Sequence, residues 1–90
     1  MPDRMDSRRK RLMFRSRHMG TAENDILFGG FAERYLADLS EAQLERYEAL
    51  LEENDIDLFN WVTGKEKAPA ALDHDVMALL KGFRPDPLSR

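Results

Sequence analysis

The stretch LSEAQLERYEALL, residues 39–51, holds the clearest helix signals in this chain of 90 residues. Ser40 and Gln43 have the spacing of a capping box, and Leu39 with Leu44 occupies the two positions of a hydrophobic staple. Apolar side chains then recur along one side of the stretch, and glutamates line the opposite side. The stretch therefore predicts an amphipathic helix that begins after Ser40 and packs against a core.

Helical spacing continues on both sides of this stretch. Before it, helices are expected at residues 7–18 and from Thr21 onward, where Leu27, Phe31 and Tyr35 form an apolar stripe. After it, a short helix is expected at residues 56–63 and a last one along the apolar positions Leu72, Val76, Leu79, Leu80 and Phe83. Gly20 is expected to end the first helix in the left-handed conformation, and Gly29-Gly30 indicates a kink or a closely packed neighbour. Because no alternating strand pattern and no internal repeat is present, the predicted fold class is all-α, a small bundle of about five short helices.

The composition is that of a single small domain. Ninety residues are near the lower limit for a core without crosslinks, and the absence of cysteine excludes disulfides and thiolate chemistry. No apolar run is long enough to span a membrane and no secretory signal is recognisable, so a soluble intracellular protein is expected. The expected organisation is a flexible tail at residues 1–7, a helical domain at residues 8–84 and a flexible tail at residues 85–90.

The charge distribution is uneven. The formal net charge is −3, yet six of the seven Arg and Lys residues among the first 25 lie between Arg8 and Arg17. Such a run is typical of a mitochondrial presequence, a nucleic-acid-binding arm or a solvated helix face, and the residues alone leave these open. A nucleic-acid-binding helical module that uses this first helix is the main alternative function. The acidic net charge and the lack of a recognition helix rich in Arg, Asn or Gln argue against it, so no nucleic acid is expected as a partner.

No group of residues has the pattern of a catalytic or metal centre. The chain has two histidines, His18 and His74; Asp73 and Asp75 flank the second, but neighbouring helix positions point in different directions. The glutamates of residues 41–52 form a row along one helix face rather than a converging pair. Phosphate-binding loops and dinucleotide motifs are absent. Neither an enzyme nor a metal site is expected.

The aromatic residues that follow the acidic helix are expected in the core. A domain this small must fill its interior with large side chains, and burial of one aromatic ring contributes ~1.5–3 kcal/mol. This argument assigns Phe59 and Trp61 to the core, and Tyr35 and Tyr47 with them.

The turn between the first two helices carries polar residues that packing does not require. Arg17, Met19, Thr21, Glu23 and Asp25 surround a glycine at the corner where the helices meet. A glycine that permits close approach, beside charged groups, suits a protein–protein contact, although an ordinary helix–helix turn has a similar composition. From the residues alone both interpretations stay open.

The order of these segments resembles that of a known family. A basic first helix leads to HMGTAEND at residues 18–25, and an acidic helix leads to DLFNW at residues 57–61. This order resembles the SdhE family, small flavinylation factors of succinate dehydrogenase, from about Arg8 to Phe83. The resemblance implies a non-enzymatic helical bundle that binds the flavoprotein subunit of succinate dehydrogenase and promotes the covalent attachment of FAD to it. Fumarate reductase, whose flavoprotein is similar, is implied as a further client.

The resemblance also assigns roles to residues. The family's turn glycine falls on Gly20, its glutamate on Glu23 and an acidic position on Asp25. The family's arginine falls on Met19, which lacks the charge and the planar fork of a guanidinium, so a neighbouring basic residue is expected to compensate. The predicted partner-binding residues are Arg17, His18, Met19, Gly20, Glu23 and Asp25.

The remaining expectations concern cofactor, assembly and location. The chain itself is expected to hold no cofactor or metal and to act on FAD attachment in its partner, and it is expected to be a monomer when free. A generic protein-interaction bundle that dimerises through Phe28, Phe31 or Met77 is the second alternative. Because only seven residues precede the similarity at Arg8, the expected location is the bacterial cytoplasm, with a mature mitochondrial matrix form as the alternative.

Overall fold

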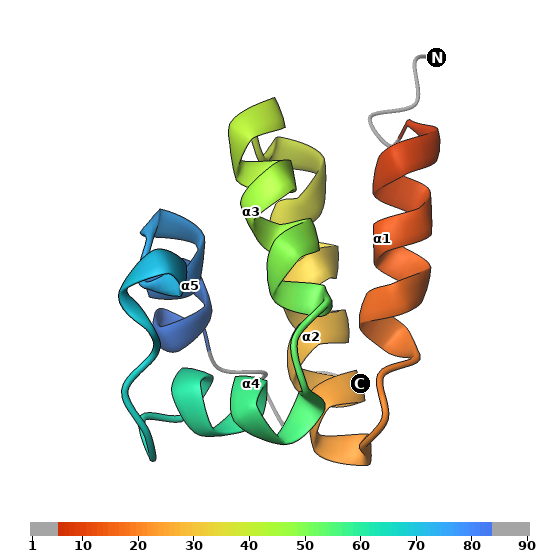
Figure 1. The fold of residues 1–90 in the computed structure, drawn as a ribbon. Coiled ribbons are helices and arrows are strands. Elements are labelled where there is room, and N and C mark those ends of the chain that lie inside the picture. The colour runs from red at the N-terminus through yellow and green to blue at the C-terminus, as the bar shows by residue number, and fades with distance from the viewer. Residues whose placement is uncertain (1–5, 84–90) are drawn as a thin grey trace.

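A computed structural model describes residues 6–83 of the chain. The α-helices are α1 (Ser7–Arg17), α2 (Ala22–Tyr35), α3 (Glu41–Leu51), α4 (Asp55–Val62) and α5 (Asp75–Gly82), with short 3-10 helices η1 (Leu36–Asp38) and η2 (Ala70–Leu72). In Figure 1, α1, α2 and α3 stand beside one another, α4 crosses their lower end, and α5 packs on α3 and α4 away from α1. The described part of the chain contains no strand, so the all-α prediction is confirmed. The predicted tails lie outside the described residues, apart from Asp6 and Ser7 at the start of α1.

A side chain caps the beginning of each α-helix, which explains where the helices start. Thr21 accepts a hydrogen bond from the Asn24 amide at 3.3 Å, as its position before α2 predicts. Ser40 and Gln43 form the predicted capping box with distances of 3.1 and 2.9 Å. Local sequence thus determines where α2 and α3 begin.

The core joins all five α-helices. Its buried apolar side chains are Leu12, Leu27, Phe28, Phe31, Ala32, Leu36, Leu39, Leu44, Tyr47, Leu50, Leu51, Leu58, Trp61, Val62, Ala68, Val76, Met77 and Leu80. Tyr47 and Trp61 are buried as predicted, whereas Tyr35 is half-buried at the margin of the core. Phe59 is also only half-buried, because its ring faces a surface groove, so its assignment to the core was wrong.

The proposed dimer surface is also wrong. Phe28, Phe31 and Met77 have no exposed surface because they form the centre of the core, where Phe31 lies 5.5 Å from Tyr47 between ring centroids. These side chains cannot contact a second copy without unfolding the bundle.

Two local predictions about glycine and the last helix need correction. Gly20 is not left-handed: among the described residues only Gly64 has a positive φ, of 84°, and α1 ends at His18, whose φ is −130° and ψ is 52°. Leu72 lies in η2 rather than in α5, because Asp73 at φ −92° and ψ 70° interrupts the helix and His74 caps a new one. The apolar spacing therefore spans two elements that pack on the same core.

Gly29 explains how α1 and α2 approach each other. The helix α2 continues without interruption through the glycine pair, and a Cβ atom at Gly29 would lie 3.3 Å from Cγ of Arg17. Of the two explanations offered by the sequence, close packing is the one confirmed at this position.

The basic residues of α1 are largely paired within the bundle. Arg8 contacts Glu41 at 3.1 Å and Glu48 at 2.9 Å, and Arg15 contacts Glu52 at 2.9 Å. These ion pairs join the basic run of α1 to the acidic face of α3. The two charged patches of the sequence are therefore largely complementary faces of neighbouring helices.

Candidate functional site

The turn between α1 and α2, residues 17–25, forms an exposed corner that we call the elbow. Gly20 lies at its tip, where its backbone N–H donates a hydrogen bond to the Asp55 carboxylate in the first turn of α4. A Cβ atom at Gly20 would collide with the same carboxylate oxygen. Glycine is therefore required here for close approach to α4 and not for backbone conformation.

Two further hydrogen bonds fix the backbone of the elbow. The Met19 amide donates to the Asp25 carboxylate at 2.5 Å, which closes the turn on itself. Asn24, fully buried, donates from its side-chain amide to the Asp55 carbonyl oxygen at 2.8 Å, and its own Oδ1 has no partner among the described residues. The elbow is thus a rigid surface feature held by α4.

The predicted partner-binding residues do not all point to one place. Gly20 and Glu23 are exposed at the elbow, whereas the Asp25 carboxylate is used to close the turn. Arg17 turns toward α2, where it pairs with Glu33 at 2.6 Å. His18 stacks on Phe14 with ring centroids 4.1 Å apart.

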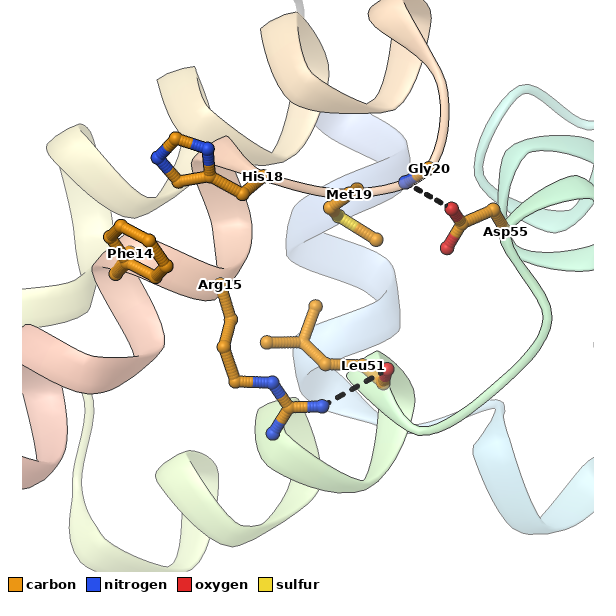
Figure 2. A pocket seen from close by; sticks show the side chains of 7 residues that line it. All are labelled: Phe14, Arg15, His18, Met19, Gly20, Leu51 and Asp55. Atoms are coloured by element: carbon orange, nitrogen blue, oxygen red, sulfur yellow. Dashed lines mark hydrogen bonds between the residues drawn. The ribbon is translucent and has the colours of Figure 1, made fainter.

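On the α1 side of the tip, Met19 lies over a pocket of ≈ 240 Å³ (Figure 2). The pocket is lined by Phe14, Arg15, His18, Met19, Gly20, Leu51 and Asp55. The Met19 side chain is half-buried and packs on the core, while the Arg15 guanidinium donates to the Leu51 carbonyl oxygen at 3.3 Å. The cation beside Met19 in this pocket is therefore Arg15, not Arg17.

On the α4 side of the tip lies a wider depression of ≈ 440 Å³, which we call the elbow groove. It is lined by Thr21, Glu23, Asp55, Ile56, Phe59, Asn60 and Lys65. The large apolar side chains that are most exposed in the described part of the chain are Ile56 (65%), Phe14 (64%) and Ile26 (61%). Ile56 and Phe14 line the two pockets, and Ile26 follows Glu23 by three residues on α2, so all three border the elbow. Exposed apolar groups gathered at one place are typical of an interaction site.

The described residues hold no arrangement typical of a metal centre or a membrane anchor. No three His, Asp or Glu side chains within residues 6–83 gather closely enough to hold a metal ion. None of the helices in this range has both the length and the apolar character needed to cross a bilayer. What the elbow does present is an apolar floor, a backbone held by hydrogen bonds and a few charged groups.

Sequence reasoning identified the elbow but not the residues that support it. The predicted partner-binding residues do not include Asp55, Asn24 or Arg15. The spacing of 35 residues between Gly20 and Asp55 has no local signal. One signal in the sequence was Asn24, a polar residue on the face of α2 that turns toward the core. A polar side chain at a buried position needs a hydrogen-bond partner from another element.

Comparison with known proteins agrees with the motifs. Residues 10–84 match the family described as flavinator of succinate dehydrogenase. The chain is 42% identical over 81 residues to "Succinate dehydrogenase assembly factor 2, mitochondrial" of Danio rerio, covering 88% of this chain and 51% of that protein. It is 38% identical over 81 residues to the protein of the same name from Dictyostelium discoideum, covering 89% of this chain and 57% of that protein. The chain thus spans about half the length of the curated relatives it matches.

Proposed function

The chain belongs to the family of succinate dehydrogenase flavinators, and from this membership we propose that it binds the flavoprotein subunit of succinate dehydrogenase as an assembly factor. Its role there is to promote the covalent attachment of FAD to that subunit. The observation that carries the proposal is the elbow: Gly20 and Glu23, which match the family's motif, are both exposed on a backbone fixed by Asp55. A buried elbow would have made a docking role impossible.

The mechanism that suits this surface is positioning. In this proposal the reacting groups, FAD and the side chain that receives it, belong to the partner, and the elbow only holds the partner in place. Holding two bound groups in a reactive orientation can lower a barrier by up to roughly 7–11 kcal/mol without any new chemistry. A rigid corner fixed by α4 is suited to this role because it loses little conformational freedom on binding.

The pockets refine which residues make the contact. Glu23 borders the elbow groove, and Met19 with Arg15 borders the smaller pocket, so the proposed surface extends on both sides of Gly20. Arg15 joins the surface as the neighbouring basic residue, because it lines the pocket beside Met19 and Arg17 does not. Both guanidinium groups also pair with glutamates, Arg15 with Glu52 and Arg17 with Glu33. The paired arginines of α1 weigh against the nucleic-acid alternative.

The assembly role also bears on location. The relatives carry "mitochondrial" in their names, which supports a matrix form of this chain over the bacterial cytoplasm expected from the sequence. We propose that the chain acts in whichever compartment its client subunit folds.

The test is co-expression with the flavoprotein subunit. Glu23→Ala should reduce covalent flavin, read as fluorescence of the subunit band in a denaturing gel, by about tenfold, since a charged contact at an interface is worth about 1.4 kcal/mol or more. Glu45→Ala removes the same charge from an exposed position on α3, distant from the elbow, and should leave flavin attachment unchanged. Equal labelling in both variants would remove Glu23 from the contact.

A further inference from the structure

We propose that the elbow groove receives a segment of the flavoprotein subunit that carries a cationic side chain next to an aliphatic one. This inference rests on the proposed function above and specifies the chemistry of the partner at that site. It goes beyond the predicted partner-binding residues, because only Glu23 among them lines the groove and most of the groove is built by α4 and the loop that follows it.

The floor of the groove is apolar and open. Ile56 is 65% exposed at its edge, and half-buried Phe59 presents part of its ring within it. Ile26, 61% exposed, continues the apolar surface along α2 beyond Glu23. Covering such side chains is favourable because it removes apolar surface from water, and an aliphatic group of a partner would bury them.

The groove already holds one cation over its aromatic ring. The Lys65 ammonium lies 5.2 Å from the centroid of Phe59, within the range of a cation–π interaction. The exposed Lys65 lies on the loop after α4, so this contact is easily exchanged for another. The ring face is therefore one on which a positive charge is favourable.

The carboxylates at the rim are available to a second cation. Glu23 forms no ion pair or hydrogen bond through its side chain with any residue in the range 6–83. Asp55 uses one carboxylate oxygen for the Gly20 amide, and its other carboxylate oxygen accepts no hydrogen bond from this part of the chain. Both carboxylates would repel an anionic segment, and Lys65 is the only cation among the described residues that line the groove. A guanidinium in place of Lys65 would stack on Phe59 and meet both acids, and its planar shape suits both contacts.

A charge reversal at Lys65 tests the sign of the occupant. The dissociation constant of the full chain for the purified flavoprotein subunit is measured by biolayer interferometry at low and high salt. Lys65→Glu should bind about three- to tenfold more tightly than Lys67→Glu, mainly through faster association, and the difference should shrink as salt screens it. Lys67 is the matched control because it is exposed on the same loop, changes the net charge equally and does not line the groove.

A second variant tests the apolar half of the inference. Ile56→Ala should weaken binding by about tenfold, because the lost side chain no longer covers the partner's aliphatic group. Its exposed position lets the bundle fold without it, which circular dichroism verifies.

The outcomes separate the two proposals. A wild-type chain that does not bind the subunit overturns the proposed function and this inference together. A wild-type complex in which Lys65→Glu binds like Lys67→Glu, or more weakly, overturns this inference alone, as does an Ile56→Ala variant of unchanged affinity.

Discussion

Gly20 is the residue on which the shape of the elbow depends most directly. Its substitution by alanine places a methyl group on the Asp55 carboxylate, so the tip must move away from α4 or the carboxylate must turn out. We expect Gly20→Ala to lower the free energy of unfolding by roughly 1 kcal/mol, because the Asp55 carboxylate can turn away but then loses its hydrogen bond with the Gly20 amide. The displaced tip should also reduce flavin attachment. Gly82→Ala is the control, because a Cβ there meets nothing within 4 Å. Chemical denaturation measures the free energy of unfolding of both variants. Equal stability of Gly20→Ala and Gly82→Ala would contradict the close approach of Gly20 to Asp55.

Tyr47 tests the polar contact at the centre of the core. Its hydroxyl lies 2.6 Å from Ser16 Oγ, which itself donates to the Leu12 carbonyl oxygen, so the tyrosine is the donor. We expect Tyr47→Phe to lower the free energy of unfolding by about 1 kcal/mol at pH 7, the net value of one such hydrogen bond. Ser16→Ala, alone and combined with Tyr47→Phe, isolates the coupling between the two side chains.

The same variant should respond differently to alkaline pH. Burial raises the pKa of Tyr47 above its ordinary value of 10.0, because the ionised phenolate would lose its solvation in the core. A raised pKa in the folded state means that stability is fully present below pH 10 and is lost as the pH rises beyond it. The difference in the free energy of unfolding between the wild-type protein and Tyr47→Phe should therefore shrink above about pH 10. A constant difference between the two proteins up to pH 11 would contradict the burial of this group.

At the scale of helices, the charged faces of α1 and α3 act as one unit. Arg8 bridges Glu41 and Glu48 on α3, and hydrogen bonding to Glu48 raises the pKa of its guanidinium. Arg8→Glu should lower the thermal midpoint by a few degrees, and adding Glu48→Arg should restore most of the loss. Arg11→Glu, at an exposed position of the same helix with no ion pair to the described residues, should have a smaller effect. Salt should reduce the difference, because such pairs are solvent-screened.

Some helix starts could be predicted from the sequence and others could not. Helix starts were predictable at Thr21 and Ser40 because a cap and the amide it binds are three residues apart. The start of α5 was not, since the apolar spacing continues from Leu72 across a break that only the backbone at Asp73 reveals. The prediction that Phe59 lies in the core was wrong for a related reason. Helical spacing predicts which face of α4 carries the ring, but it does not show whether another element covers that face.

At the scale of the whole molecule, the elbow is a product of distant segments. Its backbone belongs to the turn between α1 and α2, but its fixed shape depends on Asp55, which α4 supplies. The position of α4 in turn depends on a core that includes Leu58 and Trp61. This is why the candidate site could be located from the motif but its supporting residues could not.

A hairpin of residues 6–38 should therefore fail to replace the complete chain, although it contains all six predicted partner-binding residues. Isolated from α3 and α4 it loses both the Asp55 contacts and the core around Tyr47, and helices of this length are marginal in water on their own. If the elbow conformation is populated at about 1–10% in the hairpin, its apparent affinity for the flavoprotein subunit falls by about 10- to 100-fold. Competition against the labelled full chain measures this ratio, and circular dichroism reports the helix content. A hairpin that competes as well as the full chain would show that the elbow needs no support from α4.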